Sequence, residues 1–392
     1  METGTIGTIK WTVNNGLMVF EPIKNNEGSC HSAPNLSSIA ESVIHIKTKG
    51  LLHFSGHALS GMFRGFVNLE TADLSGFETS QATTMAGMFF TCKNLKQLNL
   101  SSFDTSNIDN MQSMFFNCGN LISLDLSSFD ASNVTNTISM FDDCKNLITL
   151  NLSNFHTSKL ANASYMFNGC SSLTSLDLSS FFTGWVENMS DMFNECSSLT
   201  SLDLSNFNTV NVYNMKRMFF KCQSLTSLDI SNFNFENVEK AENIFFLCEN
   251  LTDLSFPDYI KEKAEKLTVF ITFNNLLPSY NIKQNIKSAN KIFEILEKTN
   301  GLKFTKEREQ LKVFSSYTKI LFDGWVVAVA EILARKNCKK LSDILTILVN
   351  QQPIENIENR SIDDIVSALK NNGTASNINA YLNGVPLEDI LA

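Results

Sequence analysis

Cysteine is the residue type in this 392-residue chain whose spacing most strongly suggests chemistry. Zinc sites need several thiolate or imidazole ligands close together, which cysteines 26 residues apart with no histidine beside them do not supply. Disulfides between neighbouring repeats stay open, since bridged Cα atoms lie about 4.4–6.8 Å apart and stacked strands about 4.8 Å apart. We interpret the cysteines as free, buried thiols that pack like small apolar side chains. The seven regularly spaced ones are Cys92, Cys118, Cys144, Cys170, Cys196, Cys222 and Cys248.

The other reactive side chains do not form a recognisable catalytic set. The chain has five histidines, and none follows His156. His53 and His57 are four residues apart but lack the adjacent glutamate of a metalloprotease helix. The sequence contains no phosphate-binding loop and no nucleophile elbow. We therefore predict a protein that is not an enzyme, with no cofactor and no metal ion; the weaker alternative is an enzyme with an unrecognised helical catalytic domain.

The cysteines belong to a 26-residue repeat that predicts the fold. Counted from each cysteine, leucine recurs at positions 3 and 6. From each of the first six, leucine or isoleucine follows at position 8, phenylalanine at position 11, and usually Met-Phe at positions 22 and 23. Positions 6 and 8 share one face of a strand, and the apolar spacing from position 16 onward predicts a short helix or helical turns. Stacked copies bury faces that one copy cannot. We predict an α/β solenoid, a right-handed coil of the leucine-rich-repeat type.

Composition and charge divide the chain into three parts. A hydrophobic content of 43% excludes a disordered chain. Residues 1–65 read as a degenerate capping repeat with a β-hairpin, whose turn is Asn14-Asn15-Gly16. Residues 66–257 hold seven full repeats and a partial one, and Pro257 marks their end. Residues 258–392 carry long helical patterns, which predict an all-α C-terminal domain.

One column of polar residues is a candidate binding surface. Position 7 lies between the buried leucines of the strand, so its side chain must face outward. Three interpretations stay open: a solvated polar face, a docking surface for a basic partner, or a divalent cation site, although calcium prefers six to eight oxygen ligands. The column consists of Asp73, Asn99, Asp125, Asn151, Asp177, Asp203 and Asp229.

A second candidate binding site interrupts the repeat. Where other repeats have polar residues after the position-11 phenylalanine, one repeat has Phe182-Thr183-Gly184-Trp185. Local packing is one explanation for the two aromatic residues, and an anchor for a protein partner is the other, because exposed Trp and Phe mark contact sites. The basic segment at residues 283–340 reads as the solvated face of helices or as a contact for the acidic solenoid face. Nucleic acid is disfavoured, since the whole chain has a net charge of −9.

The repeat pattern resembles that of a known family. The unit C-x-x-L-x-x-L-x-L-S-x-F, which ends in Met-Phe as at Met140-Phe141, is similar to the repeats of BspA-like leucine-rich-repeat surface proteins, as is the opening G-T-I-G-T-I-K-W at residues 4–11. The resemblance covers residues 4–256. It implies binding to a protein or a host surface, and therefore adhesion or recognition rather than catalysis.

Two settings for this binding function are compatible with the sequence. No stretch reaches the ~18 apolar residues of a membrane span, and no secretory leader is visible. As written, the chain is predicted to be cytoplasmic, as a sensor or adaptor whose helical domain signals or assembles. If a leader has been removed, the resemblance implies a secreted or cell-surface location.

Overall fold

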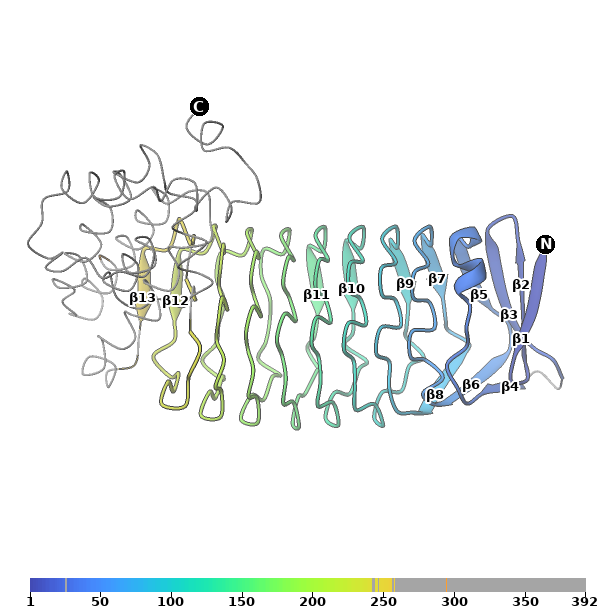
Figure 1. Cartoon of the computed structure of the whole chain (residues 1–392), viewed down its shortest axis with the longest axis horizontal. Helices are drawn as coiled ribbons and strands as arrows, with labels where there is room; N and C mark the ends of the chain where they lie inside the picture. The colour runs from blue at the N-terminus through green and yellow to red at the C-terminus, as the bar shows by residue number, and fades with distance from the viewer. Residues whose placement is uncertain (25–26, 242–243, 246, 256, 258–293, 295–392) are drawn as a thin grey trace, which may run out of the picture. The chain divides into compact units, whose positions relative to one another are not determined.

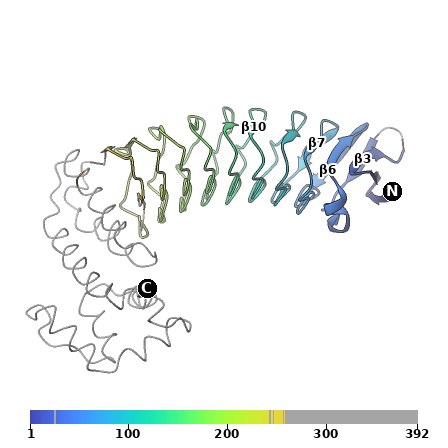
Figure 2. The same ribbon diagram turned by 90° about the horizontal axis from the view of Figure 1, so that it is seen from above.

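The computed structural model describes residues 1–24, 27–241, 244–245, 247–255, 257 and 294. The chain divides into two units, Met1–Tyr259 and Ile260–Ala392. The first unit is a solenoid of similar coils stacked one after another (Figure 1), and each coil is a narrow loop when viewed from above (Figure 2). The predicted all-α domain at residues 258–392, with the basic segment 283–340, lies outside the described residues apart from Glu294 and stays a prediction.

The described regular structure consists of short strands and one 3-10 helix, η1 (Ser37–Ser42). The strands form a six-stranded sheet, β1-β2-β3-β5-β7-β9, a three-stranded sheet, β4-β6-β8, and the pairs β10-β11 and β12-β13. Their bounds are β1 (Glu2–Ile6), β2 (Ile9–Asn14), β3 (Leu17–Pro22), β4 (Glu27–Cys30), β5 (His45–Thr48), β6 (Leu51–Gly56), β7 (Thr71–Asp73), β8 (Phe77–Ala82), β9 (Gln97–Asn99), β10 (Ser123–Asp125), β11 (Thr149–Asn151), β12 (Ser227–Asp229) and β13 (Asp253–Ser255).

The N-terminal cap contains the predicted hairpin. Strands β2 and β3 pair antiparallel around Asn15 and Gly16, whose φ angles of 51° and 79° are those of a type I′ turn. Strand β1 adds to the hairpin on one side, which the sequence analysis did not predict. On the other side, β3 pairs in parallel with β5 and joins the cap to the first coil.

The strand column of the repeats is short and interrupted. Each repeat strand spans three residues, and neighbours pair in parallel with a register of 26, as in Leu124 opposite Leu150. Residues 175–177 and 201–203 hold the corresponding positions in two coils but are not strands. Stacking of the coils therefore depends on bonds elsewhere in the repeat.

Those bonds lie in the return limb, by which we mean the second half of each coil, and they correct the prediction of a helix there. Backbone N–H groups of Gly87, Phe89 and Thr91 donate to carbonyls one coil further on, at 2.7–2.8 Å. The φ angles of Ser113 (53°) and Asn117 (55°) are positive, as are those of their counterparts in other coils, which is incompatible with a right-handed helix. The described return limbs are consecutive turns, so "α/β" was wrong for the repeats.

The interior of the coils matches the predicted one. The phenylalanines at positions 11 and 23 are buried in every repeat. Rings at position 23 stack along the solenoid, as in Phe89 and Phe115, whose centroids lie 5.6 Å apart. Each buried ring contributes about 1.5–3 kcal/mol relative to an exposed one, and each ring pair about 0.5–1.5 kcal/mol more. The two phenylalanines of each repeat therefore form much of the hydrophobic core, which explains the high phenylalanine content.

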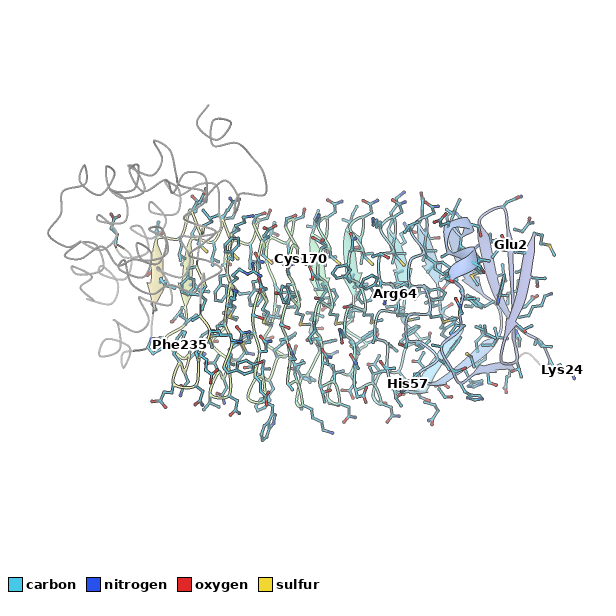
Figure 3. All side chains as sticks on the ribbon, viewed as in Figure 1. Glu2, Lys24, His57, Arg64, Cys170 and Phe235 are labelled. Carbon is cyan, nitrogen blue, oxygen red and sulfur yellow. The ribbon has the colours of Figure 1, made fainter. Side chains whose placement is uncertain are left out.

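The repeat cysteines are free thiols inside the stack, as predicted. Cys170, labelled in Figure 3, is fully buried, and its Sγ donates to the Phe141 carbonyl at 3.2 Å. The equivalent bond recurs at the other six repeat cysteines. Burial raises the pKa of Cys144 and Cys196 to about 12, so these thiols are chemically inert at neutral pH.

Candidate functional site

The position-7 column lies at the end of the three-residue strand, or of the equivalent non-strand segment, in each coil, and all seven of its residues are exposed. Each one turns the chain: the Asp177 Oδ1 accepts the backbone N–H of Ser179 at 2.9 Å, and Asn151 does the same for Ser153 at 3.2 Å. The same bond occurs at Asp73, Asn99, Asp125, Asp203 and Asp229. Short polar side chains that bond their own backbone two residues on are typical of such turns. The column therefore has a structural role that does not depend on a ligand.

The turn bonds also set the charge state of the column. The Ser179 N–H, with help from the Ser179 hydroxyl, lowers the pKa of Asp177, and Ser205 lowers that of Asp203 in the same way. These carboxylates are ionised at neutral pH and face solvent. Within the described part of the chain, no group of three or more His, Cys, Asp or Glu side chains is arranged to hold a metal ion.

Phe182 and Trp185 lie together on an edge turn, between the strand side and the return limb. Their side chains are 51% and 63% exposed. On the edge turn of the next coil, Val210 and Tyr213 are exposed as well. We call these four side chains the aromatic edge. Phe182 and Trp185 were predicted from the sequence. Val210 and Tyr213 were not, although both also replace residues that are mostly polar in the other repeats.

Threonine side chains hold these edge turns in register. The Thr183 hydroxyl donates to the Asn208 carbonyl at 3.0 Å and accepts the Asn208 N–H at 2.8 Å. Thr157 bonds Phe182 in the same way, at 2.9 Å in both directions. The buried threonines form the hydrogen bonds that the backbone of these turns needs. The side chains at positions 12 and 15 are therefore not required for these bonds and can project outward.

Trp185 replaces a stabilising residue. At the same repeat position, Asn133 and Asn211 each donate to a carbonyl of the preceding coil at 2.7 Å, as do Asn107 and Asn237. An indole at residue 185 forgoes this bond, which is worth about 1 kcal/mol. Local packing explains the Phe182 ring, which lies against Gly184, but Trp185 makes no ring contact with the described residues.

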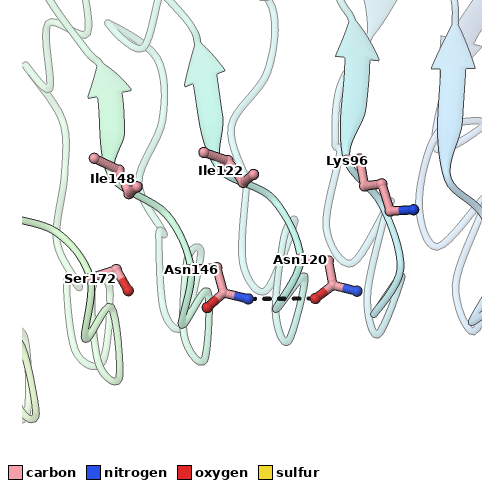
Figure 4. A pocket seen from close by; sticks show the side chains of 6 residues that line it. All are labelled: Lys96, Asn120, Ile122, Asn146, Ile148 and Ser172. Atoms are coloured by element: carbon pink, nitrogen blue, oxygen red, sulfur yellow. Dashed lines mark hydrogen bonds between the residues drawn. The ribbon is translucent and has the colours of Figure 1, made fainter.

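A shallow groove lies beside the strand column. It extends from Lys96, three coils before Trp185, to Ser172, in the same coil as Trp185. It encloses about 430 Å³ and is lined by Lys96, Asn120, Ile122, Asn146, Ile148 and Ser172 (Figure 4). Ile122 and Ile148 are exposed on neighbouring coils where later repeats carry threonine. This pair was not predicted, although the sequence shows isoleucine at a position where later repeats have threonine.

The described return limbs bury two carboxylates that were not predicted from the sequence, Asp142 and, more deeply, Asp191. Asp191 is 1% exposed, and its Oδ1 lies 2.7 Å from the Arg217 Nε. Burial raises the pKa of Asp191, while Arg217 and a hydrogen bond from Tyr165 oppose that change. These three residues occupy the same repeat position in successive coils, so they form a polar ladder. We assign it a structural role.

Among the described residues, no helix combines the length and the apolar content that crossing a membrane requires.

Comparison with solved structures gives leucine-rich-repeat proteins among its matches, at low sequence identity and low TM-score. No curated protein matches the chain. A leucine-rich-repeat protein of T. pallidum, TpLRR, is 16% identical over 66% of this chain and 93% of its own, with a TM-score of 0.26. The structure of a TLR13–ssRNA13 complex is 17% identical over 55% of this chain and 33% of that one, with a TM-score of 0.27. A leucine-rich cell surface protein of Faecalibacterium prausnitzii A2-165 is 11% identical over 65% and 95%, with a TM-score of 0.19.

The repeats themselves match a family. Two overlapping matches, at residues 57–181 and 173–258, cover the solenoid and just over half of the chain. The matched residues include the seven repeat cysteines, which we call the cysteine ladder, and the aromatic edge. The chain belongs to the family described as Mycoplasma protein of unknown function, DUF285.

Proposed function

We propose that this protein is a non-enzymatic binding protein whose solenoid recognises a protein partner through the aromatic edge. The observation that carries the proposal is the 63% exposure of Trp185, which stands where other coils place a bonding asparagine. Tryptophan and tyrosine are enriched among the residues that contribute most to protein interfaces. The exposed indole replaces a hydrogen bond between coils, and the free energy lost there would be offset by binding to a partner.

The position-7 column is a second proposed contact. Asp177, Asp203 and Asp229 present three carboxylates in succession, which suits a basic partner. The basic segment at residues 283–340 of the same chain is one such partner. Binding of separated fragments 1–257 and 258–392 to each other, weakened by salt, would support that contact, and no association at low salt would exclude it.

The resemblance to BspA-like surface proteins favours adhesion or recognition at a cell surface. The alternative is an intracellular sensor or adaptor in which the repeats select the partner and residues 258–392 signal or assemble. The charge supports separate roles for the two regions, since residues 1–257 hold 24 acidic against 13 basic side chains and the remainder is nearly neutral.

Differential capture tests the proposed function. The full chain is immobilised as wild type, as Phe182→Ala/Trp185→Ala, and as Ile122→Ala/Ile148→Ala, and extracts of the source organism and of cells it contacts are applied. The third variant is the matched control, because it also removes two exposed apolar side chains. We expect at least one protein, quantified by mass spectrometry, to be retained by wild type and control and lost from the aromatic-edge variant. Identical capture by all three would overturn the proposal.

A further inference from the structure

We propose that the aromatic edge binds a basic, extended protein segment, with arginine or lysine side chains stacked on its rings and paired with flanking carboxylates. This inference rests on the proposed function and names the chemistry of the partner. It is carried by three features of the described residues: uncovered rings, unpaired carboxylates beside them, and the charge of the edge as a whole.

The rings of the aromatic edge lack the cation that two half-buried rings elsewhere in this solenoid, Phe90 and Phe220, possess. On the return limbs, the Arg64 guanidinium (Arg64 is labelled in Figure 3) lies 4.0 Å from the centre of the Phe90 ring. The Lys221 ammonium lies 5.5 Å from the centre of the Phe220 ring. Among the described residues, no cation lies over Phe182, Trp185 or Tyr213. A cation supplied by a partner would complete the same arrangement.

Carboxylates bracket the edge. Glu187, Tyr213 and Glu239 occupy the same repeat position in successive coils, where the Tyr213 N–H donates to the Glu187 carbonyl and the Glu239 N–H donates to the Tyr213 carbonyl, both at 2.9 Å. Tyr213 is therefore flanked by a glutamate residue in the coil on each side. Neither glutamate forms an ion pair with a described residue. A cation resting on Tyr213 has a carboxylate within one coil in either direction.

The charge of the whole edge favours the same partner. Positions 12–17 of the seven repeats carry seven carboxylates and one lysine, Lys159. The Lys159 ammonium donates to the Asn133 Oδ1 at 2.7 Å, which holds it against the preceding coil. An acidic edge of this kind attracts a basic segment at long range and repels nucleic-acid phosphates and anionic membranes. A basic protein segment therefore matches both the exposed rings and the negative charge of this edge.

A peptide titration of the full chain tests the inference. The probe is a ten-residue peptide of alternating arginine and serine, and its control has citrulline at every arginine. We expect the arginine peptide to bind and the citrulline peptide to bind at least tenfold more weakly. Trp185→Ala and Glu187→Gln/Glu239→Gln should each raise the Kd about fivefold, as should an increase in salt from 0.05 to 0.5 M. Asp130→Asn removes an edge carboxylate away from the rings and should change the Kd less than twofold.

Failure of this inference can be told apart from failure of the proposed function. If the arginine peptide binds no better than the citrulline peptide, or if neither variant weakens it, the assignment of a basic segment is wrong. Partner capture that depends on Trp185 but is unaffected by Glu187→Gln/Glu239→Gln would then leave the proposed function standing with an uncharged partner. Capture that depends neither on Trp185 nor on the two glutamates would overturn both the basic-segment inference and the proposed function. Thermal unfolding of each variant confirms that it is folded before titration.

Discussion

The ring of Phe182 lies directly against the backbone of Gly184, so that a Cβ at residue 184 would come within 2.9 Å of the Phe182 Cζ. Four earlier repeats have serine at this position. The absence of a side chain at Gly184 therefore allows the Phe182 ring to pack against the backbone of this turn. The Phe182–Trp185 turn of the aromatic edge thus combines three departures from the repeat, two aromatic residues and one missing side chain.

Replacing Gly184 with serine should disturb the aromatic edge without unfolding the coil. The added Cβ must push the half-exposed Phe182 ring aside, while the backbone conformation stays acceptable. We expect the free energy of unfolding to change by less than about 0.5 kcal/mol and the Kd for the arginine peptide to rise several-fold. The control is Gly119→Ser, where the nearest heavy atom to an added Cβ is the Asp143 carbonyl oxygen at 3.8 Å. Equal Kd values for the two variants would show that the ring position is irrelevant to binding.

The position-7 column should tolerate asparagine but not alanine. Asp177→Asn keeps an acceptor for the Ser179 N–H, as the natural Asn99 and Asn151 do, whereas Asp177→Ala removes it. We expect a loss of about 0.5–1 kcal/mol in the free energy of unfolding for alanine, measured in urea against Ser175→Ala on the same strand face, and a smaller loss for asparagine.

The same bond predicts an acid dependence. The pKa of Asp177 is lower in the folded chain than in the unfolded chain, where it is about 3.9. The stabilisation by the Asp177 carboxylate is therefore complete above the unfolded pKa and is lost as the pH falls through the folded pKa. The stability of Asp177→Asn should therefore fall less than that of wild type between pH 5 and pH 2. A steeper fall for the variant would contradict the assignment.

The cysteine ladder should be unreactive until the solenoid unfolds. With a pKa of about 12 for Cys144 and Cys196, about one thiol in ten thousand is ionised at pH 8. In a Cys30→Ser/Cys338→Ser background, we expect DTNB to release no thionitrobenzoate from the native chain within an hour and seven equivalents in guanidinium chloride. Rapid reaction of the native ladder would show that the thiols are accessible.

The ladder should also make the solenoid sensitive to alkali. Since the folded pKa lies above the unfolded value near 8.5, the stabilisation is complete below pH 8.5 and is lost as the pH rises toward 12. At pH 10 each buried thiol forfeits about 2 kcal/mol. Cys144→Ala should lower stability at pH 7 but lose less of it between pH 7 and 10 than wild type does, as thermal unfolding would measure. Parallel pH profiles would refute this linkage.

The buried Asp191 should require Arg217. Arg217→Met leaves a carboxylate that is 1% exposed without its cation, although the Arg217 side chain is itself 36% exposed. We expect a loss of about 2 kcal/mol, below the range for fully buried pairs because of that exposure. Asp191→Asn in the same background should recover most of the loss. Lys216→Met, next to Arg217 but outside the pair, is the control; an equal loss there would mean that the pair is unimportant.

The sequence by itself determined the stack, its cap and its interior. A 26-residue period with leucine at positions 6 and 8 can bury those side chains only by repetition, so the Phe, Met and Cys columns of the core followed from spacing alone. The turn at Asn15-Gly16 followed from the preference of these residues for positive φ. The exposure of Phe182 and Trp185 was similarly foreseeable, because they stand at polar positions of the repeat.

The tertiary structure decided the return limb and the meaning of the polar columns. Apolar residues three and four apart fit a helix, but the backbone donors at Gly87 and Phe89 bond to the next coil, and a bond between coils cannot be read from the period of one coil. The aspartates at position 7 looked like a binding stripe because their outward direction followed from the strand alternation, whereas the structure shows that each first accepts a backbone N–H two residues on. Only stacking placed Tyr213 between Glu187 and Glu239, because residues 26 apart become neighbours when coils lie side by side.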